Sequence, residues 1–131
     1  MKIPANTTAL AFIGDAVYEL FVRNLILERG WTNADKMHII AVRYVRAESQ
    51  AKALKGILNE LSDEEKDLVR RARNRKSTSK PKNADPVEYK LATAFEALVG
   101  YLYLSGENER AEKVCHLAVA VIDGAKEAEY E

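Results

Sequence analysis

The stretch Ala9–Leu20, ALAFIGDAVYEL, most constrains the fold, because it places one carboxylate inside a segment that otherwise has the character of a buried helix. Asp15 is the only charged residue between Ile3 and Tyr18. Removing a lone ionised carboxylate from water is costly unless it is hydrogen-bonded, paired or bound to a cation. The fold must therefore provide Asp15 with a partner.

A second stretch, LATAFEALVGYLYL, repeats the arrangement, and Glu96 is its only charged residue. Small residues such as Ala11 and Gly100 lie beside the two carboxylates, so we expect the two helices to cross there and bring Asp15 and Glu96 together. Two carboxylates at such a distance repel each other unless a cation lies between them. Hard oxygen ligands favour Mg²⁺ or Mn²⁺, which predicts a metal site.

Structural roles for these acids remain open from the residues alone. Asp15 is alternatively a buried, hydrogen-bonded acid, and Glu96 is alternatively paired with an arginine such as Arg23 or Arg43. Asp85 stands before a proline in the first position of a helix, so it is interpreted as a helix cap rather than a metal ligand.

Length and charge narrow the class of protein. A chain of 131 residues with 47% hydrophobic residues is long enough for one globular domain, covering residues 1–131, with a real core. The formal net charge is zero, so attraction to nucleic acid must come from a local patch. No signal-peptide pattern and no apolar run long enough to span a membrane is present, which predicts a cytoplasmic protein.

The helical periodicity of apolar residues predicts an all-α chain of about six to seven helices. Asn33 and Asp85 are in capping positions, and Ser62 and Glu65 have the spacing of a capping box. The expected helices cover about residues 8–28, 33–56, 57–61, 63–73, 86–105 and 108–125.

A basic segment interrupts this pattern. It contains seven cations and no acid between Arg70 and Lys82, and it lacks apolar periodicity. Duplex nucleic acids are bound mainly through their phosphates, so such a loop is a candidate contact surface, although a solvated linker has the same composition. The candidate phosphate contacts are Arg73, Arg75, Lys76, Lys80 and Lys82, and Asn83 either reaches a backbone hydroxyl or holds the loop.

The motifs LAFIGDAV and TAFEALVGYLYL resemble, in order and separation, the two acidic motifs of ribonuclease III nuclease domains. The strings GDAVYEL, RYVRAESQAKAL, RARNRKS and PKNADPVEYKLATAFEALVGYLYL extend the resemblance over nearly the whole chain and are closest to the Mini-ribonuclease III subfamily.

The resemblance implies an all-helical endonuclease domain that acts as a homodimer on double-stranded RNA with Mg²⁺, for which Mn²⁺ substitutes. It implies that Asp15 and Glu96 are both catalytic residues and metal ligands, and that Phe12 packs across the dimer interface. The expected products carry 5′-phosphate and 3′-hydroxyl ends. The expected substrate is the precursor of 23S ribosomal RNA, whose ends the enzyme matures, with a large-subunit ribosomal protein as a candidate partner.

The sequence departs from the longer ribonuclease III pattern at two acidic positions, where it has Ala11 and Thr93. This difference leaves the number of metal ions open and predicts a weaker metal affinity. A non-catalytic module of the same fold, binding double-stranded RNA or the ribosome, is therefore the alternative function. A helical dimeric scaffold whose basic loop binds an acidic protein is a further one.

Overall fold

The computed structural model describes residues 2–76 and 82–130, with side chains described as far as residue 124. These residues form six α-helices and one 3₁₀ turn, and no strand occurs among them, which confirms the all-α prediction. The elements are α1 (Thr7–Glu28), α2 (Ala34–Val45), α3 (Ala47–Ile57), η1 (Leu58–Glu60), α4 (Asp63–Asn74), α5 (Pro86–Leu104) and α6 (Asn108–Tyr130). Over this part of the chain, no helix has the length and apolar character needed to cross a membrane.

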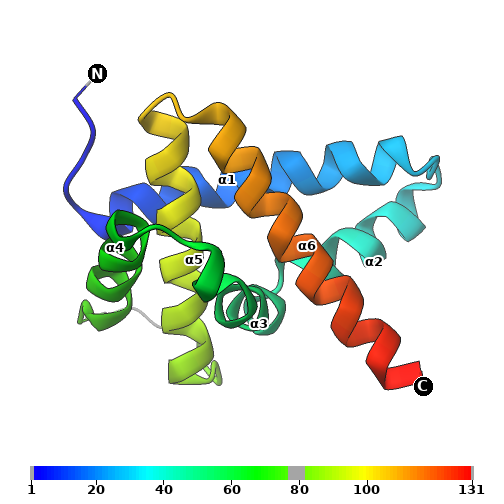
Figure 1. Ribbon diagram of the computed structural model, residues 1–131. Coiled ribbons are helices and arrows are strands. Elements are labelled where there is room, and N and C mark those ends of the chain that lie inside the picture. Colours follow the sequence, from blue (N-terminus) through cyan, green and yellow to red (C-terminus); the bar gives the residue numbers. More distant parts are fainter. Residues whose placement is uncertain (1, 77–81, 131) are drawn as a thin grey trace.

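Helix α5 is the centre of the fold. It crosses α1, and α3 and α4 lie on either side of its N-terminal half (Figure 1). Phe95 of α5 is completely buried, and the ring of Tyr18 from α1 meets it edge to face at 4.9 Å between centroids. Because α1, α3, α4 and α6 all contact α5, its sequence is apolar on nearly every face.

The sequence predicted one long helix over about residues 33–56. This prediction is wrong, because α2 and α3 are separate helices. Arg46 has an extended conformation with ψ of 151°, which ends α2 and redirects the chain. Side chains satisfy backbone carbonyls at the break: Ser49 Oγ donates to the Arg43 carbonyl at 2.6 Å, and Gln50 Nε2 donates to the Val45 carbonyl at 2.7 Å. Such local bonds compete with the regular helix ladder, and here they replace it.

The predicted helix starts are confirmed. Asn6, which precedes α1, accepts hydrogen bonds from two backbone amides, and Asn33 accepts one at the start of α2. Ser62 and Glu65 form both bonds of a capping box. Asp85 accepts from the first backbone amides of α5 at 2.8 and 3.1 Å, so its interpretation as a cap is also confirmed.

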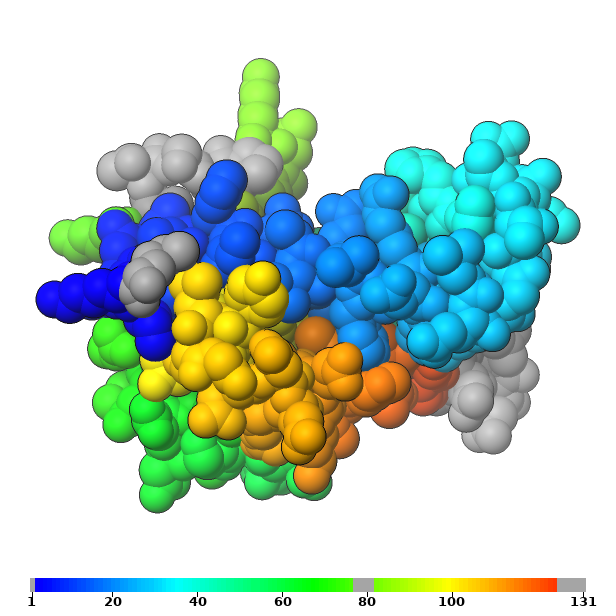
Figure 2. Space-filling view, turned by 90° about the horizontal axis from the view of Figure 1, so that it is seen from above, coloured from blue at the N-terminus to red at the C-terminus, as the bar shows by residue number. Residues whose placement is uncertain are grey.

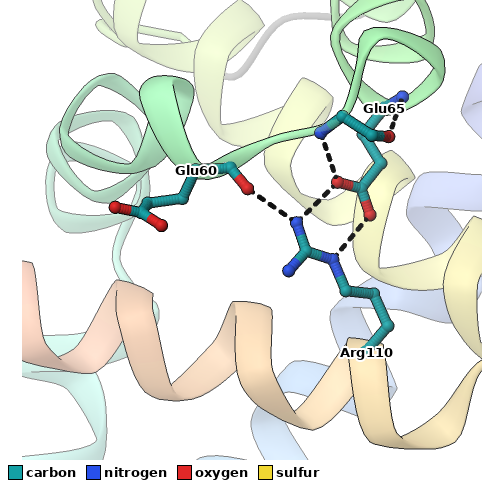
Figure 3. A network of polar contacts seen from close by, with 4 residues as sticks. Glu60, Glu65 and Arg110 are labelled. Carbon is teal, nitrogen blue, oxygen red and sulfur yellow. Dashed lines mark hydrogen bonds and ion pairs between the residues drawn. The ribbon is translucent and has the colours of Figure 1, made fainter.

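A polar network fixes α6 to η1 and to the first turn of α4. The Arg110 guanidinium donates to both Glu65 carboxylate oxygens at 2.7 and 2.9 Å and to the Glu60 carbonyl at 2.8 Å (Figure 3). The bond from Arg110 is the main reason why the pKa of Glu65 is lowered. Glu65 is only 5% exposed, and its charge is stabilised by these Arg110 donors together with the backbone amide of Ser62.

Candidate active site

Two glycines, one on each helix, set the crossing of α1 and α5. A Cβ atom at Gly14 would overlap the carbonyl oxygen of Glu96 and lie 2.8 Å from the amide nitrogen of Gly100. A Cβ atom at Gly100 would overlap the carbonyl oxygen of Leu10 and lie 2.9 Å from Cγ2 of Ile13. The two backbones are therefore in direct contact, which glycine alone permits. The predicted close approach of the two helices is confirmed.

This crossing brings the two carboxyl groups together. Asp15 is exposed, Glu96 is partly buried, and the two carboxyl groups lie close enough to interact. Burial, followed by the interaction with Asp15, raises the pKa of Glu96 to about 8. When no cation lies between the two groups, Glu96 is therefore mainly protonated at neutral pH, which removes the repulsion between two like charges.

The structural alternatives for these acids are contradicted. Asp15 is exposed rather than buried. Arg23 pairs with Glu19 at 3.0 Å, and within residues 2–76 and 82–124 no ion pair involves Glu96. No cation of the protein neutralises this pair in the part of the chain whose side chains are described.

A third side chain at the site, Gln50 of α3, was missed by the sequence interpretation. It is 3% exposed, and its amide interacts with the Glu96 carboxyl, which lowers the pKa of Glu96 and partly opposes the effect of burial. No signal in the sequence indicated it, because Gln50 stands among other polar residues such as Glu48 and Ser49. Its contact with α5 depends on the break at Arg46, which the apolar period did not reveal.

The donor set fits a hydrated divalent cation. Among the described residues there is no group of three or more His, Cys, Asp or Glu side chains placed to hold a metal, so Asp15 and Glu96 are the available acidic ligands. Mg²⁺ commonly binds one or two carboxylates and retains several waters. Ala11 is buried, and the Thr93 hydroxyl donates to the Tyr89 carbonyl at 2.8 Å, so neither position adds a charge.

The predicted phosphate contacts lie at the end of α4 and before α5. Four of them are exposed, and Lys80 lies outside the described residues; the four are Arg73, Arg75, Lys76 and Lys82. These side chains are accessible to a polyanion, as the sequence predicted. Their role in binding RNA stays a prediction.

One of these cations also has a structural contact. Arg75 Nη1 donates to Asn6 Oδ1 at 2.6 Å, which ties the end of α4 to the start of α1. Asn6 precedes Asp15 by nine residues, so this contact lies roughly 13 Å from the acidic pair along the helix axis. Asn83 has a φ of 72°, a left-handed conformation that asparagine tolerates better than most residues, and its role in the loop stays a prediction.

Helix α1 also presents large apolar side chains to solvent. Phe12 is 82% exposed, Leu20 is 62% exposed and Leu27 is 58% exposed. Their spacing of eight and seven residues places them on one side of the helix. Figure 2 shows α1 along an open face of the molecule, between α2 and the C-terminal end of α5.

Comparisons with known proteins agree on one family. The family model described as "Ribonuclease III domain" matches residues 8–107. The chain is 49% identical over 114 residues to Mini-ribonuclease 3 of Symbiobacterium thermophilum, covering 87% of this chain and 88% of that protein. It is 45% identical over 119 residues to Mini-ribonuclease 3 of Brevibacillus brevis, and this alignment covers 91% of this chain and 89% of that protein. The fold is also similar to a crystal structure of a Fusobacterium nucleatum protein, with a TM-score of 0.78 and 34% sequence identity. The superposition covers 88% of this chain and 93% of that protein.

Proposed function

Because the chain belongs to the ribonuclease III family, and within it to the Mini-ribonuclease III group, we propose that this endoribonuclease uses Mg²⁺ to cleave double-stranded RNA. The observation that carries the proposal is the acidic pair at the glycine crossing, in which Asp15 is exposed and Glu96 is partly buried. One nuclease domain spans residues 1–131 in this proposal. The protein acts in the cytoplasm, leaves 5′-phosphate and 3′-hydroxyl ends and matures the ends of 23S ribosomal RNA precursor, with a large-subunit ribosomal protein as a helper.

In the proposed mechanism, Asp15 and Glu96 hold Mg²⁺, and Mn²⁺ substitutes for it. When bound, Mg²⁺ would supply charge neutralisation at the scissile phosphate and activation of the attacking water. Glu96 would hold the ion in its ionised form, so it would release the proton that its raised pKa retains in the absence of a cation. The exposed position of Asp15 leaves the pair accessible to a phosphate of the RNA backbone.

The basic side chains position the duplex in this proposal. The side chains proposed to bind phosphates are Arg73, Arg75, Lys76, Lys80 and Lys82. The bond to Asn6 orients Arg75. Asn83 holds the turn that carries Lys82. Phosphate contacts of this kind fix the register of the RNA without reading its sequence.

A homodimer belongs to the same proposal. Large exposed apolar side chains grouped on one helix mark an interaction surface, and Phe12 and Leu20 satisfy this description. Asp15 lies on the next turn of α1 after Phe12, so a partner packed on this surface would lie beside the acidic pair. Two such sites in one dimer would cut both strands of a duplex.

The proposed activity is tested by incubating a labelled RNA duplex of about thirty base pairs with the protein and Mg²⁺, with Mn²⁺, and with a chelator. Metal-dependent cuts in both strands are expected, with no cuts in single-stranded RNA or in duplex DNA. Binding without cleavage in either metal, also on a stem from a ribosomal RNA precursor, would contradict an enzyme.

Binding without cleavage would favour the second candidate function, a non-catalytic RNA-binding module of the same fold. The observation in its favour is that Ala11 and Thr93 occupy positions at which the longer ribonuclease III pattern has acids. Thr93 is also committed to a helix carbonyl, so it does not replace the missing ligand.

Mg²⁺ affinity is expected to rise with pH. Because the pKa of Glu96 is raised to about 8, a proton competes with the cation below that pH. The apparent dissociation constant should fall about tenfold per pH unit between pH 6 and pH 8 and level off above. Isothermal titration calorimetry in buffers of different ionisation enthalpy should detect the release of about one proton per cation at pH 7. An affinity independent of pH over this range would contradict the prediction.

Neutralising the basic side chains is expected to weaken binding and reduce its salt dependence. The variant Arg73→Ala, Lys76→Ala, Lys82→Ala should lower the slope of log K against log salt by about two to three. A matched control carries Lys52→Ala, Lys55→Ala and Lys113→Ala, which remove three exposed cations from α3 and α6. Fluorescence anisotropy of a labelled RNA duplex, recorded in chelator over a range of salt concentrations, measures the slope for each variant. Equal slopes for the two variants would exclude the basic segment as the contact surface.

A further inference from the structure

Gln50 lies at the junction between the helix break and the acidic pair. It is in the first turn of α3, is 3% exposed, and its Nε2 donates to the Val45 carbonyl at 2.7 Å. That carbonyl belongs to the last residue of α2, where the chain leaves the helix. The amide group is therefore held in place by the backbone rather than by another mobile side chain.

Gln50 has hydrogen-bonding capacity left over and lies beside the Glu96 carboxyl. A primary amide has two N–H donors and one carbonyl acceptor, and the Val45 carbonyl uses one donor. The amide also interacts with the Glu96 carboxyl in the sense that favours its ionised form. Gln50 therefore lies close enough to the proposed metal ligand to influence its charge, while its one bond to the backbone fixes the amide.

The acceptor of this amide has no partner. Gln50 Oε1 is buried and accepts no hydrogen bond within the described part of the chain, where the only other such side-chain atom is Ser105 Oγ. Other buried polar side chains are satisfied: Ser49 is bonded to the Arg43 carbonyl, and Glu65 is bonded to Arg110. Buried acceptors are normally satisfied, so an orphan next to an acidic pair indicates that something outside the chain donates to it.

We propose that Gln50 is a positioning residue of the acidic site, which orients the Glu96 carboxylate with its N–H and accepts a hydrogen bond at Oε1 from a water hydrating the divalent cation. Groups that hold metal ligands and their waters in this way set metal affinity without binding the metal themselves. The inference rests on the proposed function, because it requires a cation at Asp15 and Glu96.

The test compares Gln50→Met with Ser49→Ala. Methionine has a similar length and no amide, so it removes both interactions. Ser49 is the matched control, because it is 4% exposed and bonds a carbonyl at the same helix break, while its hydrogen bonds join it to Arg43 and Arg46 and not to Glu96. Each variant loses hydrogen bonding at the break, so both are expected to unfold at lower temperature than the wild type.

Calorimetric titration with Mg²⁺ distinguishes a role at the metal site from a purely structural role at the helix break. Gln50→Met is expected to weaken binding by about 10 to 100-fold and to lower kcat with little change in KM for duplex RNA, while Ser49→Ala stays within about twofold of the wild type. Gln50→Met with wild-type affinity, or an equal loss in Ser49→Ala, would overturn the proposal. If the wild type neither binds Mg²⁺ nor cleaves RNA, the proposed function itself fails.

A measurement on the wild type keeps the proposal testable if Gln50→Met does not fold. The side-chain ¹⁵N–¹H resonances of Gln50, assigned through their proximity to Val45, are expected to shift on addition of Mg²⁺. The shift should saturate with the calorimetric affinity. Resonances that stay fixed while Mg²⁺ binds would overturn the role of Gln50.

Discussion

The variant Glu96→Gln is expected to lose cleavage of duplex RNA by about 10³-fold or more while binding the duplex nearly as well as the wild type. Glutamine has the same size as glutamate but no charge, so it cannot replace the carboxylate ligand beside Asp15. The phosphate contacts lie on α4 and the following segment, and the substitution does not touch them. Single-turnover cleavage and anisotropy measured on the same preparation give the two quantities.

Stability provides the control for this variant. The raised pKa of Glu96 means that its ionisation destabilises the folded protein, by an amount that develops as pH rises above the ordinary glutamate pKa and is complete above pH 8. Glu96→Gln removes this penalty and should melt at or above the wild-type temperature at about pH 9 in chelator. Glu88→Gln, on the same helix, should retain full cleavage. Turnover within about tenfold of the wild type in Glu96→Gln would refute the assignment of Glu96.

The acidic pair was predictable from the sequence because its causes are local. Each of two apolar stretches contains a single charged residue, and small residues beside both mark the place where the helices approach. These two signals are enough to pair Asp15 with Glu96. Asp15 is exposed in the fold, so burial of its charge is not what pairs it with Glu96. The raised pKa of Glu96 depends on burial by the packed helices, which no local pattern contains.

The role of Gln50 was not predictable, because it depends on the change of chain direction at Arg46 between α2 and α3. The apolar stripe continues from α2 into α3, so periodicity predicted one helix through Arg46. The break is stabilised by side-chain bonds from Ser49 and Gln50 to carbonyls that precede them. Bonds of this kind are individually weak and common in loops, so composition alone does not distinguish them from a solvated polar pair.

The variant Gly100→Ala is expected to destabilise the fold by about 3 kcal/mol or more, and so to lower the melting temperature by about 10 °C or more. In an open helix position the same change would stabilise the protein by about 1 kcal/mol, because alanine is the better helix former. At Gly100 the new Cβ overlaps the carbonyl oxygen of Leu10, and a backbone atom cannot move aside as a side chain does. Thermal unfolding followed by circular dichroism measures the effect.

The other helical glycines provide a graded control. Gly124 has no atom within 4 Å of a new Cβ, so Gly124→Ala should be neutral or stabilising. At Gly56 the new Cβ would lie 2.8 Å from the methyl groups of Val121, a side chain that can rotate, so the loss should be intermediate. If Gly100→Ala melted at nearly the same temperature as Gly124→Ala, the backbone contact would not be what holds α1 against α5.

The corresponding change on α1 connects this contact to the site. A Cβ at Gly14 overlaps the carbonyl oxygen of Glu96 itself, so a Gly14→Ala protein that still folds must displace α5 relative to α1 at the residue that carries the carboxylate. Reactive groups misplaced by about 1 Å lose on the order of 10²-fold in rate. Loss of Mg²⁺ affinity and of cleavage in a folded Gly14→Ala variant would therefore follow from geometry alone, since Asp15, Glu96 and Gln50 all remain. The helix crossing that stabilises the fold is thus also what sets the distance between the two carboxylates.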